Sequence, residues 1–398
     1  MRGSRRPRGR WARLGPMDFA LSPEHEEIRR TVRDFAEREV APVADEMERA
    51  GEFPTEIVRR AAELGLLGVP FPESVGGTGL DSVAYAITVE ELSRVWGSLG
   101  IIVSAHTSLG CNPLYLAGTP DQQERFLRPL ASGEKLGAYG LTEAEAGSDS
   151  RGTRTRAVRD GDEWVINGSK RFITNAGVAG TYIITALTDG AAAGRISAFI
   201  VEADAPGFSI GRMEDKMGLH ASRTGELLFD DCRVPAANLL GEEGGGDRLF
   251  LQTLDGGRIG IGAMALGLAQ AAYEAAAAYA KERRQFGRQI ASFQGVAFKI
   301  ADMATRIDAA RLMVYRAAWL KDQGRPFGTE AAMAKLFASE VARDVTNDAV
   351  QVHGGYGYVV EYRVERYLRD AKLTEIGEGT SEIQRLVIAR HLLGVRAM

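Results

Sequence analysis

Apolar residues in the first third of the chain recur at the spacing of an amphipathic helix, as in the series Ile28, Val32 and Phe35. Ser22 precedes this series and is followed by proline and acidic residues, which is the composition of a helix start. Similar helical patterns continue to about Leu136. We therefore expect this part of the chain to be helical.

The periodicity changes after Leu136. Short runs with alternating apolar residues follow one another up to about Leu240, and Asp160-Gly161 and Asn167-Gly168 lie between such runs. Asp-Gly and Asn-Gly pairs in this position are strong signals for hairpin turns. We expect a compact antiparallel β domain, shaped as a barrel or a sandwich. Its expected strands are 153–157, 164–166, 171–174, 182–187, 196–201, 208–210 and 226–229.

Long helical patterns return from about Asp247. Segments 263–284, 298–323 and 329–353 are each longer than about twenty residues, which is typical of a helical bundle. The order of helices, strands and helices predicts an α+β chain. The expected parts are a basic extension 1–16, an N-terminal helical domain 17–136, a β domain 137–246 and a C-terminal helical bundle domain 247–398.

The charges are unevenly distributed. Six arginines and no acidic residue fall within residues 1–16. Of the 49 basic and 53 acidic residues in all, the rest of the chain therefore holds 43 and 53, and this acidic balance argues against nucleic acid as a partner. The extension lacks the apolar core of a secretory signal. We expect it to be disordered, with Met17 as an alternative start.

Several functional classes are disfavoured by what the sequence lacks. Cys111 and Cys232 have no metal-site spacing and form no disulfide framework, so reduced thiols and no metal site are expected. No run of eighteen apolar residues is present, so we expect no membrane span and a cytoplasmic location. Rossmann and P-loop glycine motifs are missing. Segment 207–211 matches G-x-S-x-G, but its place among predicted strands disfavours a hydrolase nucleophile.

The most informative residues lie near the C-terminus, where Glu378 stands between Gly377 and Gly379. Ser381 and Gln384 follow at the spacing of a helical capping box. A carboxylate on a turn with slim backbone on both sides can approach a ligand, which suits a general base. The helix dipole alone also favours an acidic residue near a helix start, so this residue by itself leaves its role open.

The wider string resembles the signature of the acyl-CoA dehydrogenase family. Arginine-aspartate-alanine-lysine at 369–372 leads into glutamate-glycine-threonine-serine at 378–381. The resemblance implies that Glu378 is the catalytic base, as this glutamate is in most of the family. Gly377 replaces the family's usual tyrosine and changes one wall of the acyl pocket. A minority of the family carries the base at the position of Gly257, where a glycine leaves the role to Glu378.

Further motifs in family order support the resemblance and imply FAD as the cofactor. Thr142 and Ser148 lie in a loop similar to the family's flavin loop, and Phe172 replaces a tryptophan in a flavin-facing strand. Arg283 begins a motif that contacts FAD largely from a neighbouring subunit, and its fork suits a pyrophosphate. The residues that the resemblance assigns to FAD are Leu141, Thr142, Ser148, Phe172, Thr174, Arg283, Phe286, Gln294, Gln351, Gly354, Gly355, Thr380 and Glu382.

A short motif in the C-terminal part resembles the family's CoA-contacting turn. Its polar residues are Asp255 and Arg258, and from the bare sequence they are also compatible with a solvated turn that opens a helical domain. The residues that the resemblance assigns to the substrate are Ser148, Asp255, Arg258, Gly377 and Gly379.

The resemblance covers the chain from about residue 21 to 393 and implies a function. Helical N-terminal, β-barrel-like middle and four-helix-bundle C-terminal domains are expected. The implied reaction is FAD-dependent α,β-dehydrogenation of a short-chain or short branched-chain acyl-CoA to the trans-2-enoyl-CoA. Glu378 would take the α-proton, the β-hydride would pass to flavin N5, and electrons would leave to electron-transferring flavoprotein. A homotetramer is expected. An acyl-CoA oxidase that uses oxygen and a non-catalytic helical scaffold remain as alternatives.

Overall fold

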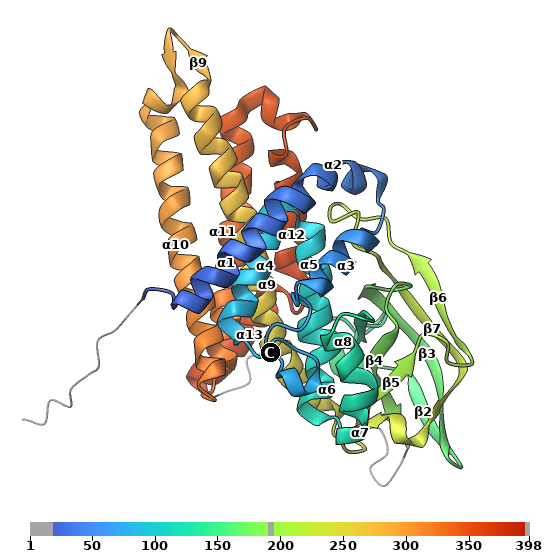
Figure 1. The fold of residues 1–398 in the computed structure, drawn as a ribbon. Helices are drawn as coiled ribbons and strands as arrows, with labels where there is room; N and C mark the ends of the chain where they lie inside the picture. Colours follow the sequence, from blue (N-terminus) through green and yellow to red (C-terminus); the bar gives the residue numbers. More distant parts are fainter. Residues whose placement is uncertain (1–18, 190–194, 395–398) are drawn as a thin grey trace, which may run out of the picture.

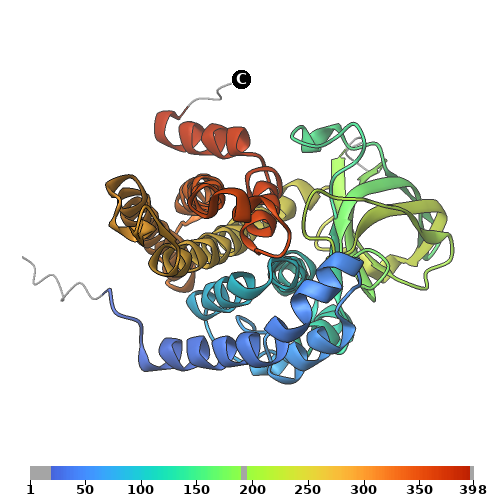
Figure 2. The same cartoon turned by 90° about the horizontal axis from the view of Figure 1, so that it is seen from above.

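The computed structural model describes residues 19–189 and 195–394 (Figure 1). Helices come first, a sheet follows, and helices close the chain, which confirms the expected α+β order. The extension 1–16 and Met17 lie outside the described residues, so the disorder expected there stays a prediction. Seen from above, the C-terminal helices and the sheet lie on opposite sides, and the N-terminal helices run beside both (Figure 2).

The N-terminal part is helical, as its apolar pattern predicts. The hydroxyl of Ser22 accepts a hydrogen bond from the backbone N–H of His25 at 3.2 Å and caps the first helix. Residues 36–40, 106–111 and 123–127 are π-helical and join successive α-helices. The helices are α1 (Pro23–Phe35), α2 (Ala41–Ala50), α3 (Thr55–Glu63), α4 (Ser82–Val95), α5 (Gly97–Ala105), α6 (Asn112–Ala117), α7 (Pro120–Gln122) and α8 (Arg128–Ala131).

The middle part forms an eight-stranded sheet in the order β6-β7-β3-β2-β4-β5-β8, with β1 beside β4. Both β1 and β2 run parallel to β4, so the expected antiparallel sheet is wrong and the sheet is mixed. A parallel pair needs a long crossover, and the chain between these strands supplies it. The strands are β1 (Gly137–Gly140), β2 (Arg156–Asp160), β3 (Glu163–Thr174), β4 (Thr181–Thr188), β5 (Arg195–Glu202), β6 (Phe208–Met213), β7 (Thr224–Pro235) and β8 (Leu239–Leu240).

One of the two predicted hairpin turns is present. Gly161, at φ 60°, turns the chain between β2 and β3. The second prediction is wrong, because Asn167-Gly168 lies inside β3, at a point where the register against β7 shifts. A Cβ at Gly168 would lie 2.8 Å from the Cα of Thr155. Glycine therefore allows a bulge beside the neighbouring strand here, not a turn.

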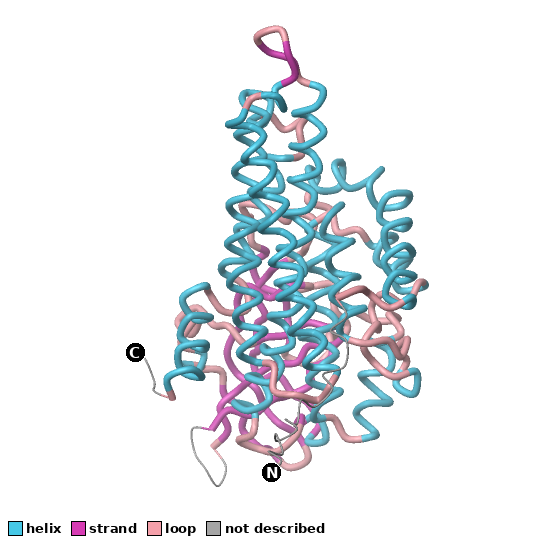
Figure 3. Tube along the Cα trace, turned by 90° about the vertical axis from the view of Figure 1, so that its left-hand side faces the viewer, coloured by secondary structure: helices cyan, strands magenta, loops and turns pink. Residues whose placement is uncertain are grey.

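The C-terminal part is a bundle of long helices, followed by one more helix. Figure 3 shows the long helices side by side, with the hairpin of β9 (Arg284–Gln285) and β10 (Arg288–Gln289) projecting from one end. By length and composition α9 could cross a membrane, but 78% of its most apolar window is buried in the protein, as in a core helix. The helices are α9 (Gly246–Glu282), α10 (Gln294–Asp322), α11 (Gly328–His353), α12 (Val364–Ile376) and α13 (Ser381–Leu393).

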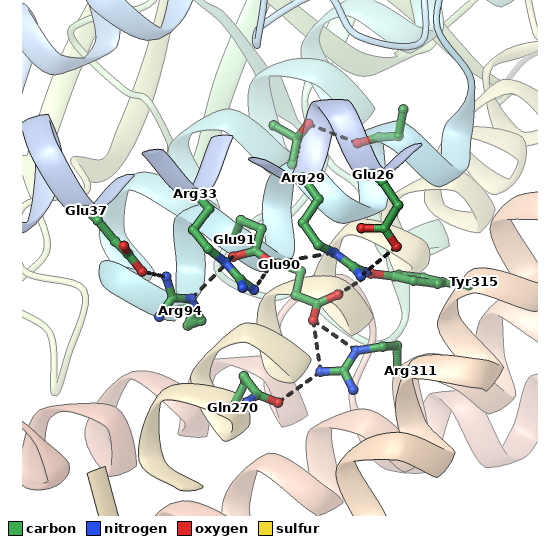
Figure 4. Close-up of polar contacts among 12 residues, drawn as sticks. Glu26, Arg29, Arg33, Glu37, Glu90, Glu91, Arg94, Gln270, Arg311 and Tyr315 are labelled. Carbon is green, nitrogen blue, oxygen red and sulfur yellow. Dashed lines mark hydrogen bonds and ion pairs between the residues drawn. The ribbon is translucent and has the colours of Figure 1, made fainter. Parts of the chain in front are cut away.

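Two buried carboxylates form ion pairs that join the N-terminal helices to each other and to the bundle (Figure 4). Glu91 of α4 accepts two hydrogen bonds from Arg33 of α1, at 2.9 and 2.7 Å. Its neighbour Glu90 accepts two from Arg311 of α10, at 3.1 and 3.0 Å, and a third from the hydroxyl of Tyr315. Because both carboxylates are buried, these pairs define how α4 lies between α1 and α10.

The three parts of the chain meet at loop 216–222, which connects β6 to β7. Glu48 of α2 accepts hydrogen bonds from the backbone N–H of His220, at 2.6 Å, and from that of the next residue. Asp370 of α12 accepts one from the N–H of Leu219, at 2.8 Å. Burial, together with the nearby Glu48 carboxylate, raises the pKa of Asp370 to about 7. Two buried carboxylates therefore attach the sheet to both helical parts.

Candidate active site

Glu378 lies on a short turn between α12 and α13. Its φ is 54° and that of Gly379 is 95°, so two successive residues have left-handed backbone. Thr380 caps α13, because its hydroxyl accepts a hydrogen bond from the N–H of Ile383 at 3.3 Å. The turn therefore ends at a defined helix start, as the sequence indicates.

The expected capping box is wrong by one position. Ser381 is the first helical residue, whereas Thr380 has the extended backbone of a cap, with φ −60° and ψ 165°. The side-chain amide of Gln384 does not reach back to a backbone N–H. It donates instead to the carbonyl oxygens of Glu378, at 3.3 Å, and Gly379, at 2.9 Å. Gln384 thus braces the turn that carries the candidate base.

The carboxylate of Glu378 is buried against α9. The residue as a whole is half-buried, but both carboxylate oxygens are out of solvent, and neither has a hydrogen-bond partner among the described residues. A Cβ at Gly257 would overlap one of these oxygens and lie 2.9 Å from the carboxyl carbon. It would also lie 3.3 Å from the side chain of Leu109. The acid therefore occupies the space that a side chain at position 257 would fill.

Burial raises the pKa of Glu378 to about 7, and the positive charges of Lys335 and Arg258 act in the opposite direction. A carboxyl group with this pKa can both accept and return a proton near neutral pH. Arg258 is 3% exposed and pairs with Asp255 one turn earlier on α9. The solvated turn that the bare sequence allows at these two residues is therefore wrong, because both lie inside a long helix that continues through glycine.

Tyr85 and Lys335 are neighbours of Glu378 that sequence reasoning did not identify. A Cβ at Gly260, one turn after Gly257, would overlap the hydroxyl oxygens of Tyr85 and Ser104. Helix α9 therefore packs closely against α4 and α5 at this point. Lys335 is completely buried in α11. The sequence signal that could have identified Lys335 is its place within the alanine-rich pattern of that helix, since lysine is rarely buried without a specific partner.

The residues expected at the flavin ring gather where β1 ends and beside the end of β3. The carbonyl of Leu141 accepts a hydrogen bond from Lys170 at 3.3 Å, and that of Thr142 accepts one from the N–H of Arg171 at 2.8 Å. Phe172 lies next to them with 62% of its surface exposed. Thr174 closes β3, and Ser148 lies on the exposed loop that follows Thr142.

A second group of expected FAD residues lies at the far end of the bundle. Arg283, Gly354 and Gly355 line an open hollow of about 550 Å³. Phe286 is 92% exposed on the β9–β10 hairpin, which Figure 1 shows at the opposite end from α13. Gln294 begins α10 beside this hairpin, and Gln351 lies in the last turn of α11, just before the two glycines. One chain therefore does not bring this group together with Glu378.

The residues at these two places fit FAD by their chemistry. An exposed phenylalanine beside polar backbone suits a flat ring with polar edges. Arg283 suits a pyrophosphate because its guanidinium can donate several hydrogen bonds to phosphate oxygens. Gly354 and Gly355 have no atom within 4 Å of an added Cβ, so a phosphate can approach their backbone closely. Thr380 and Glu382, also expected at FAD, lie instead at the start of α13 beside Glu378.

Three profiles of one protein family match consecutive parts of the chain. The acyl-CoA dehydrogenase N-terminal domain matches residues 22–134, the middle domain residues 138–232, and the C-terminal domain residues 244–393. A short-chain specific acyl-CoA dehydrogenase of Clostridium acetobutylicum is 54% identical, over 94% of this chain and 99% of its own. An acyl-CoA dehydrogenase of Bacillus subtilis is 51% identical, with the same coverage.

Solved structures give the same result. Butyryl-CoA dehydrogenase of Megasphaera elsdenii has a TM-score of 0.93 at 47% identity, over 95% of this chain and 100% of its own. A chain in a structure of the electron transferring flavoprotein of Acidaminococcus fermentans has the same TM-score and coverage at 50% identity. An acyl-CoA dehydrogenase of Bacillus anthracis in complex with FAD has a TM-score of 0.89 at 38% identity, over 94% of this chain and 67% of its own.

Proposed function

The chain belongs to the acyl-CoA dehydrogenase family, and on this premise we propose that it oxidises short-chain or short branched-chain acyl-CoA with Glu378 as its base. It is a flavin-dependent oxidoreductase that binds FAD and dehydrogenates acyl-CoA. The proposal adds the identity of the base, the size of the acyl group, the electron acceptor and the residues of the site.

The single observation that carries the assignment of the base is the state of the Glu378 carboxylate. Both of its oxygens are buried and have no hydrogen-bond partner among the described residues. A buried carboxylate without a partner is costly, so such groups occur where chemistry requires them. Its raised pKa, about 7, suits the removal of a weakly acidic proton near neutral pH.

The proposed reaction divides its work between the residues and the cofactor. A Glu378 oxygen takes the α-proton of the thioester as that C–H bond breaks. The backbone N–H of Glu378 holds the thioester oxygen, where negative charge develops, and such a bond strengthens in the transition state. Bound FAD supplies a two-electron acceptor for the hydride that leaves the β-carbon. The cations of Lys335 and Arg258 favour the ionised form of the base before the substrate binds.

We propose that two chains complete each FAD site. Leu141, Thr142 and Phe172 hold the ring system, together with Ser148, Thr174, Thr380 and Glu382. The group at the far end of the bundle, led by Arg283 and Phe286, serves the FAD of another copy. The separation of this group from Glu378 within one chain supports the homo-oligomer, and the tetramer expected from the family is part of the proposal. The remaining members of this group are Gln294, Gln351, Gly354 and Gly355.

Gly377 supports a small or α-branched acyl group. It lies at the end of α12 beside the base, with φ −65° and ψ 149°. A glycine at this position leaves space near the α-carbon that a tyrosine ring would fill. Gly379, Asp255 and Arg258 complete the proposed substrate contacts, and Ser148 contacts both substrate and cofactor. Relatives described as short-chain specific support the size, whereas branching rests on Gly377 alone.

Electron-transferring flavoprotein is the proposed electron acceptor, which is supported by the similar chain from the Acidaminococcus fermentans structure. We also propose the division into domains 17–136, 137–246 and 247–398, and a cytoplasmic location. The family profiles, which change at about the same residues, support the division.

Anaerobic titration with a panel of acyl-CoA thioesters tests the proposal. Butyryl-CoA and isobutyryl-CoA should bleach the flavin absorbance of the purified holoenzyme at lower concentrations than octanoyl-CoA and palmitoyl-CoA. Glu378→Gln should retain FAD and bind substrate, but the rate of flavin bleaching should fall by several orders of magnitude, because an amide accepts no proton. Undiminished bleaching in this variant places the base elsewhere. Rapid peroxide formation in air identifies an oxidase, and purified protein without flavin identifies a scaffold.

A further inference from the structure

Lys335 is a buried lysine that the proposed reaction does not need as an acid, a base or a ligand. It lies in α11, and its side chain has no exposed surface. Burying an ammonium group is energetically costly unless close partners compensate. Only one hydrogen-bond acceptor of its ammonium is found among the described residues. It is the carbonyl oxygen of Gly379, at 2.7 Å. The lysine therefore acts on the residue that follows the base.

The turn that Lys335 contacts has an unusual backbone. Glu378 has φ 54°, a backbone conformation that is strained for a non-glycine residue. Such a conformation persists only where surrounding contacts impose it. Two side chains do so here: Lys335 from α11 and Gln384 from α13 both donate to the carbonyl oxygen of Gly379, at 2.7 and 2.9 Å.

The turn in this conformation directs the Glu378 carboxylate toward Gly257. If the Gly379 carbonyl were released, the peptide after Gly379 could rotate, and the turn could relax and carry the Glu378 side chain away from α9. Lys335 also brings a positive charge close to the Glu378 carboxylate, which has no hydrogen-bond partner among the described residues. A nearby cation favours the ionised form of a carboxyl group.

We propose that Lys335 is a positioning residue for Glu378. Its ammonium holds the Gly379 carbonyl, and with it the left-handed turn that aims the carboxylate, while its charge favours the ionised form of that carboxylate. This inference rests on the proposed role of Glu378 as the base. Lys335 makes two contributions, a hydrogen bond and a charge. Gln384 makes only the first, because its amide donates to the same carbonyl without a charge.

Other charged groups lie near the same carboxylate, and their arrangement makes the pH dependence specific. Arg258 on α9 acts in the same direction as Lys335, and Asp255 on the same helix partly neutralises it. Glu375 on α12 and Glu382 on α13 favour the charged form of Lys335. The phenol of Tyr85 on α4 is neutral at pH 7, since burial raises its pKa. Removing the Lys335 charge therefore leaves Arg258 as the remaining cation.

The test compares three variants of the holoenzyme by their pH profiles of kcat. Lys335→Met removes the charge and the hydrogen bond, so kcat should fall at least about tenfold, with KM changed less than about threefold. The midpoint of the rising limb should move up by about one pH unit, because loss of a cation raises the pKa of Glu378. Lys335→Gln keeps a donor and should shift the midpoint with a smaller loss of kcat. Gln384→Leu should lower kcat without moving the midpoint.

Lys372→Met is the matched control, since Lys372 is exposed on α12 and pairs with Glu375 at 2.7 Å. It should leave kcat and its pH midpoint unchanged. An unchanged midpoint in both Lys335 variants, measured in folded and flavin-loaded protein, overturns the proposal. If Lys335→Met does not fold, Lys335→Gln alone decides the question of charge. If Glu378→Gln is active, the proposed base fails instead, so the two failures are distinguishable.

Discussion

The carboxylate of Glu378 fills the space that a side chain at Gly257 would need. An added Cβ at Gly257 would overlap a carboxylate oxygen of Glu378, although Gly257 lies in α9 and Glu378 lies more than one hundred positions later, on the turn between α12 and α13. The position of the base therefore depends on the absence of a side chain in the middle of α9. That dependence can be tested without changing Glu378 itself.

Gly257→Ala should fold and retain FAD but lose turnover. The methyl group overlaps the carboxylate, which must move, and a displacement of about 1 Å at a reacting group can lower kcat roughly 100-fold. Steady-state kinetics with butyryl-CoA measure the loss. Gly295→Ala on α10 is the control, because no atom lies within 4 Å of its added Cβ. Equal activity of the two variants would contradict the close approach of Glu378 to α9.

Gly377→Tyr should change substrate preference and leave the fold intact. The backbone at Gly377 is one that any residue adopts, and the three atoms nearest to an added Cβ belong to Leu373, at 3.5 Å or more. The tyrosine should lower kcat/KM for isobutyryl-CoA more than for butyryl-CoA, roughly 10-fold or more, since one methyl in a pocket is worth about 1–3 kcal/mol. An unchanged ratio of the two kcat/KM values would remove the support for branched substrates.

Arg283→Glu should lower flavin occupancy and weaken assembly together. Arg283 lines the hollow at the far end of the bundle and lies 5.2 Å from the ring of Tyr356. A carboxylate there would repel a pyrophosphate carried by another copy. The flavin-to-protein absorbance ratio and sedimentation velocity check both effects. A fully flavin-loaded, active monomer would refute the shared site.

Glu90→Gln should destabilise the fold without removing the base. Glu90 is buried and accepts hydrogen bonds from Arg311 and Tyr315, so its loss removes the closest ion pair of a partly buried arginine. The expected cost is about 2–3 kcal/mol, less than for a fully buried pair, because Arg311 keeps some solvent contact. Urea denaturation measures it. Glu124→Gln, which breaks an exposed pair with Arg128, should cost less than about 0.5 kcal/mol.

Acid should destabilise the sheet through Glu143. Burial alone would raise its pKa, but Lys170, Thr153 and the backbone N–H of Arg154 lower it to about 2. A carboxyl group whose pKa is lower in the folded state contributes stability above its unfolded value of 4.5 and loses it as pH falls toward 2. Glu143→Gln should therefore be less stable at pH 7, by roughly 2–3 kcal/mol. Its stability should fall less steeply between pH 4.5 and 2, as denaturation at several pH values would show.

The sequence predicted elements that depend on local chemistry. Ser22 as a helix cap and Gly161 as a hairpin turn are set by a few neighbouring residues, and both are found. Gly168 was predicted as a turn and lies in a bulge. This bulge is decided by the closeness of Thr155, just before β2, and a local sequence pattern does not contain that contact.

The sequence motifs predicted the candidate base, but they did not predict the residues that pack around it. Glu378 could be named from the residues around it, and its short contact with Gly257 agrees with the absence of a side chain at that position. Lys335 and Tyr85 come from α11 and α4, and only packing brings them to the turn. Thr380 replaced Ser381 as the cap because backbone angles, not residue spacing, decide which hydroxyl faces the helix.

The pairing of Glu90 has a consequence for how the protein is made. Its partners Arg311 and Tyr315 follow more than two hundred residues later, so α4 leaves the ribosome long before they are synthesised. Until then a helix that the folded protein buries on nearly every side also carries a carboxylate that cannot yet be paired. Such an intermediate exposes surface that aggregates readily. The N-terminal helices should therefore depend on chaperones during translation until α10 has emerged.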